Sequence, residues 1–186
     1  MIKRLLIISA GASLVAPASA VAHGVAASRY LETAKPYAPY EFLIGDWYSK
    51  VEGITVHQQF GWGPGKAYLT YSTFMVLPGK PEMLHFGGMM VWNGKSKALD
   101  FLFTLQPPTG AEEKGTMSVE PDGSVVRESE MTDSSGKTER LRQTFRKADS
   151  GTVVTSMAEE TARGWKVNPP GDIVMRRQTQ TADAPR

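Results

Sequence analysis

The side chains best suited to metal or haem chemistry in this sequence are its three histidines, His23, His57 and His85. A zinc site normally takes at least three protein ligands, and haem iron takes an axial ligand such as histidine. His23 lies in the N-terminal segment, and the strand alternation described below places His57 and His85 on the outer face of a sheet. Two outward histidines with Asp100 nearby are typical of a surface, so we expect no metal and no cofactor.

Acid–base chemistry would need carboxylates that are buried together, so that the pKa of one of them is raised. The sequence has three groups of neighbouring acids: Glu112-Glu113, Glu128 with Glu130, and Glu159-Glu160. Cross-strand pairing explains the second group, and solvated loops explain the other two. The chain has no cysteine and no nucleophile-elbow, Walker or His-Glu-x-x-His motif. Disulfides and thiolate sites are therefore excluded, and no motif indicates a particular catalytic reaction.

One cation, Arg127, is predicted to point into the protein interior. Opposite charges pair across its hairpin when Glu128 faces Arg142, whereas a slip of one residue would bring like charges together. This register places Arg127 on the same face as Leu141 and Phe145, which favour the interior. A buried arginine needs an anionic partner. We therefore keep three alternatives for Arg127: it anchors an acidic ligand, it forms an internal ion pair, or its side chain reaches solvent at the open end of the fold.

The sequence predicts that these side chains lie on β-strands, because apolar runs alternate with turn residues along most of the chain. A first strand starts at Asp46, and Asn93-Gly94 predicts a hairpin with a two-residue turn. The remaining predicted strands are Thr55–Trp62, Ala67–Val76, Met83–Trp92, Lys97–Leu105, Thr116–Glu120, Ser124–Thr132, Lys137–Arg146, Thr152–Glu159 and Asp172–Thr179. With turns about every dozen residues, this pattern predicts an all-β, antiparallel up-and-down barrel of about ten strands.

Alternation along the first strands also predicts which side chains face inward. The inward set is Phe60, Trp62, Leu69, Tyr71, Met75, Leu84, Phe86, Met90, Trp92, Leu99, Phe101 and Phe103. These side chains can fill the barrel or line a cavity for an apolar ligand, and both interpretations stay open. Gly87 and Gly88 leave room inside. The residues that we expect to bind a ligand are Trp62, Tyr71, Phe86, Met90, Phe101, Phe103 and Arg127.

Residues 1–20 are typical of a secretory signal peptide, with Lys3 and Arg4 before an apolar run and Ala18-Ser19-Ala20 as the cleavage site. The apolar run is shorter than the roughly 20 residues that span a bilayer. Cleavage removes two cations and no acid, so the mature chain is about neutral, which argues against nucleic acid or a membrane surface as partner. We expect a periplasmic or secreted protein with a flexible lead-in at 21–39, a barrel domain at 40–180 and a tail at 181–186.

The segment Phe42-Leu43-Ile44-Gly45-Asp46-Trp47 resembles the Gly-x-Trp signature of the calycin superfamily, which includes lipocalins, fatty-acid-binding proteins and ten-stranded nitrobindin-type barrels. In architecture the resemblance spans residues 40 to 179, and it extends to secreted bacterial barrel proteins of unknown function. It implies that Trp47 plugs the closed end and that Arg176 or Arg177 packs over its ring. Nitrobindin-type haem binding takes a late histidine, and this chain has none after His85.

The fold and the resemblance together predict an exported binding or carrier protein that holds a small, mostly apolar or amphipathic ligand in the barrel, with an acidic head near Arg127. Two alternatives stay open. One is a barrel enzyme of cyclase or isomerase type that acts on a hydrophobic substrate, with Tyr71 as proton donor. The other is a structural or interaction protein with a filled core.

Overall fold

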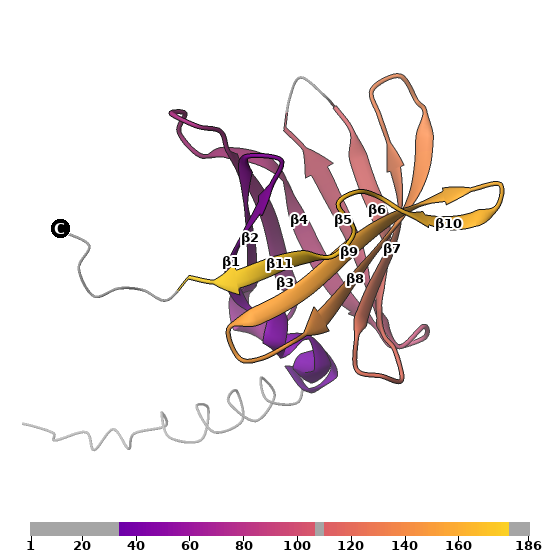
Figure 1. The fold of residues 1–186 in the computed structure, drawn as a ribbon. Coiled ribbons are helices and arrows are strands. Elements are labelled where there is room, and N and C mark those ends of the chain that lie inside the picture. The colour runs from indigo at the N-terminus through magenta and orange to yellow at the C-terminus, as the bar shows by residue number, and fades with distance from the viewer. Residues whose placement is uncertain (1–33, 107–109, 179–186) are drawn as a thin grey trace, which may run out of the picture.

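The protein is described by a computed structural model that covers residues 34–106 and 110–178 of the 186-residue chain. Within these ranges, two short 3-10 helices accompany eleven strands (Figure 1). The helices are η1 (Lys35–Leu43) and η2 (Pro64–Lys66). The strands are β1 (Gly45–Val51), β2 (Ile54–Trp62), β3 (Leu69–Val76), β4 (Met83–Asn93), β5 (Ala98–Leu105), β6 (Glu112–Val119), β7 (Val125–Thr132), β8 (Thr138–Lys147), β9 (Thr152–Thr161), β10 (Gly164–Val167) and β11 (Ile173–Arg177).

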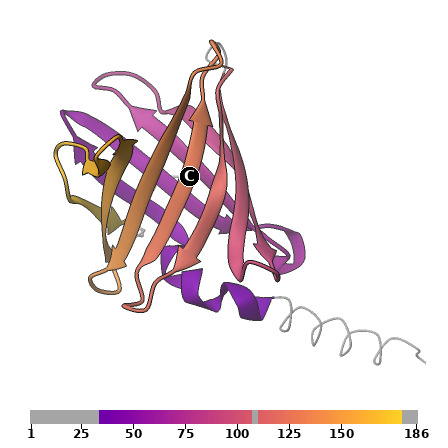
Figure 2. The same cartoon turned by 90° about the vertical axis from the view of Figure 1, so that its right-hand side faces the viewer.

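Ten of these strands form one closed antiparallel barrel. Neighbours in sequence pair from β1 to β9, while β11 lies between β9 and β1 and completes the ring. The eleventh strand, β10, pairs with the last residues of β9, past the point where β11 begins. It therefore stays outside the ring (Figures 1 and 2). The predicted all-β, ten-stranded barrel is confirmed.

The ring has one incompletely paired seam, where β11 meets β1. Only Trp47 and Tyr48 of β1 pair with β11, although both strands continue beyond this point. Continuing this register would place Ser49 opposite Met175 and Lys50 opposite Val174, but within the described part of the chain these pairs do not belong to the ladder. Backbone pairing at this seam is therefore short, although Lys50 and Val174 still border one hollow on the surface.

The hairpin after β4 has a longer loop than the predicted two-residue turn. The side-chain oxygen of Asn93 accepts hydrogen bonds from the backbone N–H groups of Lys95 and Ser96, and the ladder restarts with Asn93 opposite Ala98. The loop therefore contains four residues instead of two. Because the register changes by an even number, every side chain keeps its predicted face.

A bulge in β4 corrects two of the face assignments. Thr73 of β3 pairs with Phe86, but the next residue, Phe74, pairs with Leu84, so that His85 is the additional residue. An extra residue reverses the alternation beyond it. Leu84, predicted to face inward, is 36% exposed on the outside, and His85, predicted to face outward, lines the interior.

One end of the barrel is closed by η1 (Figure 2). A 3-10 helix has about three residues per turn, so Tyr37, Tyr40 and Leu43 lie along one face, and all three are buried. The Tyr37 hydroxyl donates to the backbone oxygen of Ala67, and the Tyr40 hydroxyl donates to that of Met117. Burial raises the pKa of Tyr40 to about 12. The last residues of the expected lead-in, 35–39, thus belong to this helix. Within the described ranges, no helix is both long and apolar enough to cross a membrane.

Trp47 lies beside this closure, and the arginine that covers it requires a glycine at position 45. The indole is 1% exposed, and its Nε1 donates to the Leu43 backbone oxygen at 2.6 Å. The Arg177 guanidinium lies 4.5 Å from the ring centroid and donates to the Phe42 oxygen. Gly45 has φ of +129°, and a Cβ there would lie 2.5 Å from the Arg177 Nη1. Only glycine therefore leaves room for the arginine that covers Trp47.

Candidate ligand-binding cavity

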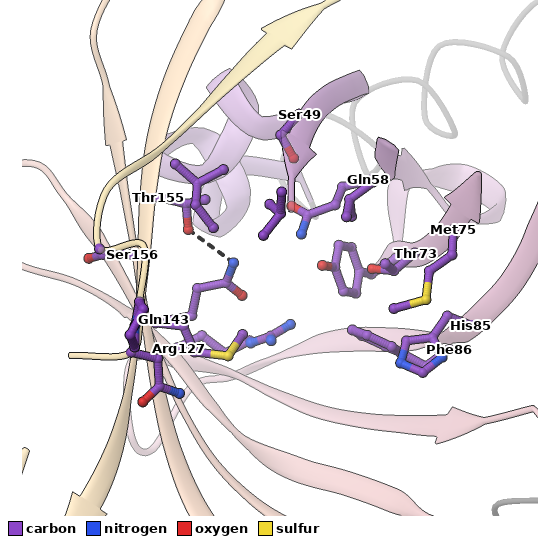
Figure 3. A pocket seen from close by; sticks show the side chains of 18 residues that line it. Ser49, Gln58, Thr73, Met75, His85, Phe86, Arg127, Gln143, Thr155 and Ser156 are labelled. Atoms are coloured by element: carbon purple, nitrogen blue, oxygen red, sulfur yellow. Dashed lines mark hydrogen bonds between the residues drawn. The ribbon is translucent and has the colours of Figure 1, made fainter. Parts of the chain in front are cut away.

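A cavity of about 350 Å³ occupies the half of the barrel away from η1. It is lined by the beginnings of β2, β4 and β11, by the ends of β1 and β3, and by the middle of β9 (Figure 3). The other half of the barrel is packed with buried apolar side chains. The barrel is therefore filled near its closed end and hollow near its opposite end.

Arg127 of β7 lines the cavity and forms a buried ion pair with Glu113 of β6, which lies outside the cavity lining. The Arg127 Nη2 lies 3.4 Å from the Glu113 Oε1, and each side chain is only 4% exposed. The guanidinium carbon also lies 5.5 to 5.8 Å from the ring centroids of Tyr71, Phe101 and Phe103, within the range of cation–π attraction. Of the three alternatives for Arg127, the structure shows the internal ion pair.

The partner of Arg127 corrects the expectation that Glu113 lies in a solvated loop. β6 begins at Glu112, so Glu113 follows the strand alternation inward, on the same face as Met117. Gly115 lies between them, and the backbone of β7 packs so closely against it that a Cβ there would lie 2.0 Å from the Glu128 backbone oxygen. The Glu159-Glu160 group is also in a strand, where Glu160 pairs with Arg140 on the outside.

Next to the ion pair, four polar side chains place buried oxygen atoms in the cavity without a hydrogen-bond partner in the described structure: Gln58 Oε1, Tyr71 OH, Thr73 Oγ1 and Gln143 Oε1. Gln143 donates from Nε2 to the Thr155 hydroxyl at 3.0 Å, which directs its oxygen into the cavity (Figure 3). The Tyr71 hydroxyl is near Thr73 and Arg127 but makes no hydrogen bond of ordinary geometry, and burial raises its pKa. Together with Arg127 and Glu113, these side chains form what we call the polar floor.

The cavity becomes apolar with distance from the polar floor. Its walls toward the open end consist mainly of aliphatic, thioether and aromatic side chains, namely Val51, Val56, Met75, Phe86, Met157, Pro169 and Ile173. Polar groups return at His85, Ser156 and Asn168, whose burial is intermediate, and at Ser49, which is buried. A molecule with a polar head and an apolar body would meet matching surfaces if it entered head first.

The structure places the seven predicted ligand-binding residues in two regions. Tyr71, Phe86 and Arg127 line the cavity. The other four, Trp62, Met90, Phe101 and Phe103, belong to the core or pack against it, outside the cavity lining. Sequence reasoning did not count Gln58, Thr73 and Gln143 among the ligand-binding residues. Their signal was available, because they are polar residues at inward positions of strands.

The two described histidines lie on opposite sides of the barrel wall, although both were expected outside. His57 points outward but is only 6% exposed, because its ring stacks between Tyr48 and Phe74. Its Nδ1 lies 2.7 Å from Glu82, and its Nε2 lies 3.0 Å from Asp46. In the described ranges, no three histidine, aspartate or glutamate side chains are grouped as metal ligands. His23 lies outside these ranges.

Comparison with known proteins leaves the family of this chain open. No protein-family model matches the sequence, and no curated protein matches it either. The closed ten-stranded antiparallel barrel is compatible with a calycin-like fold. The site must therefore be interpreted from its own geometry.

Proposed function

We propose that this protein is an exported, calycin-type carrier or binding protein that holds a small, mostly apolar molecule in the cavity. The observation that carries the proposal is a hollow of about 350 Å³ with apolar walls above a buried polar floor. Cavities of roughly 300 to 1,000 Å³ with a few placed polar groups are typical of small-molecule sites. A protein that needed only a filled core would not keep four unpartnered oxygens inside it.

A barrel enzyme is the second candidate, because the Tyr71 phenol faces the cavity and could donate a proton. Burial raises the pKa of Tyr71, so the phenol stays protonated near neutral pH. A cyclase or isomerase would also need a base to remove a proton. The buried carboxylate nearest to the phenol, Glu113, is already paired with Arg127. This pairing favours a carrier over an enzyme.

Native mass spectrometry of the protein purified from its own exported compartment tests the carrier proposal. We expect the wild-type protein to retain a small molecule, and Thr73→Phe to lose it, because the larger ring would fill the polar floor. Thr70→Phe is the matched control, since Thr70 lies on the outer face of the same strand. A wild-type protein that carries no molecule after gentle purification, or a Thr73→Phe variant that retains it, would contradict the proposal.

Export itself is a separate prediction, because residues 1–33 lie outside the described ranges. We expect the signal peptidase to cut after Ala20 or Ala22, so that the mature chain begins at Val21 or His23. N-terminal sequencing of the protein from the periplasm or the medium checks this expectation. Recovery of a chain that still begins at Met1 in the membrane fraction would show that the segment is an uncleaved anchor.

A further inference from the structure

We infer that the ligand presents to the polar floor a neutral head group that donates hydrogen bonds, such as a primary amide or an alcohol, and not a carboxylate. This inference rests on the proposed carrier function and specifies the chemistry of its ligand. It replaces the acidic head that the inward position of Arg127 suggested.

The first reason is the charge balance of the polar floor. Arg127 and Glu113 are each 3% exposed and lie 3.4 Å apart, so the pair as a whole carries no net charge. A carboxylate head would bring a second negative charge to a guanidinium that already compensates Glu113. Two buried carboxylates that share one cation repel each other, and the repulsion is stronger in a protein interior than in water. An uncharged head avoids this cost.

The second reason is the kind of atom that the polar floor leaves unpartnered. The side-chain oxygens of Gln58 and Gln143 are hydrogen-bond acceptors, and they extend from different walls into the same space (Figure 3). A carboxylate offers them only further acceptors. An amide N–H₂ or a hydroxyl can donate to them.

A neutral head can also use the donors that remain. The hydroxyls of Tyr71 and Thr73 can donate to the head's own oxygen, and both line the cavity. A primary amide has two N–H donors and one oxygen acceptor, so it offers a partner to both kinds of group on the polar floor. Desolvated hydrogen bonds of this kind discriminate strongly between head groups, because a head group without matching donors or acceptors leaves buried groups unpaired.

Three probes with the same length of chain test the inference: octanamide, 1-octanol and octanoate, titrated calorimetrically into the mature protein at about pH 8, where octanoate is ionised. We expect octanamide or octanol to bind about tenfold or more tightly than octanoate, since the acid leaves the glutamine oxygens unpaired. Octanoate binding equally well or better would overturn the inference and leave the carrier proposal standing. Absence of binding by all three probes would overturn both.

Two variants connect this preference to the polar floor. Gln58→Met removes one acceptor at similar volume, so octanamide affinity should fall about tenfold, whereas Gln59→Met on the outer face of the same strand should change nothing. Glu113→Gln leaves Arg127 without its anion, so octanoate affinity should rise about tenfold, which removes most or all of its disadvantage against octanamide. Unchanged octanamide binding in a folded Gln58→Met protein would refute the inference even where Glu113→Gln fails to fold.

Discussion

Replacement of Arg127 by methionine should destabilise the protein by about 3–5 kcal/mol, because it leaves Glu113 as an uncompensated charge in the interior. The methionine keeps much of the apolar stem, so lost packing contributes little. The change also removes the contacts that the guanidinium makes with three aromatic rings. Urea unfolding followed by tryptophan fluorescence would show the loss as a lower midpoint with a similar slope.

A double variant distinguishes the cost of an unpaired buried charge from the other effects of losing Arg127. Arg127→Met combined with Glu113→Gln removes both charges and should recover a large part of the lost stability. Arg142→Met is the control, since its partnership with Glu128 is more than one-third exposed and should contribute less than about 1 kcal/mol. An Arg127→Met variant as stable as Arg142→Met would show that the buried pair has no special role in stability.

Truncation of Trp47 to alanine should cost a similar amount, about 3–5 kcal/mol, because a large buried aromatic leaves a cavity that the barrel cannot close. The change also removes the hydrogen bond to the Leu43 oxygen and the surface on which the Arg177 guanidinium rests. The variant should unfold at a much lower denaturant concentration than the wild type, or fail to accumulate during expression.

Trp165→Ala is the matched control for this truncation. Trp165 lies on β10, outside the ring of ten strands, and its ring is covered mainly by the guanidinium of Arg142. Exposed cation–π contacts contribute about 0.5–1 kcal/mol. Equal effects of the two truncations would mean that Trp47 does not act as a plug.

The barrel could be predicted because its signals are local. Glycine, proline and asparagine mark the turns, and alternation between them assigns faces correctly wherever the ladder is regular. Charge pairing across β7 and β8 predicted the observed register of Glu128 with Arg142 and of Glu130 with Arg140. The partner of Trp47 also agrees with the resemblance, which implied Arg176 or Arg177.

The remaining features depend on contacts that have no local signal. The bulge at His85 contains no glycine or proline, and its position is set by how β3 and β4 pair beyond it. Glu113 was predicted to lie in a loop because Pro107-Pro108 comes shortly before it, but its distant partner Arg127 makes an inward strand position favourable. The helix η1 carries buried apolar residues at every third position, a period that is easily overlooked in a segment that contains Pro36 and Pro39.

The short pairing between β1 and β11 bears on which part of the barrel wall opens first. Ser49 borders the cavity near this seam, and it also borders a second hollow on the outer surface. Proteins open first where few backbone hydrogen bonds hold neighbouring segments together. We therefore expect the backbone amides of β1 and β11 along this seam to exchange their hydrogens faster than those of β7 and β8, which pair over eight positions.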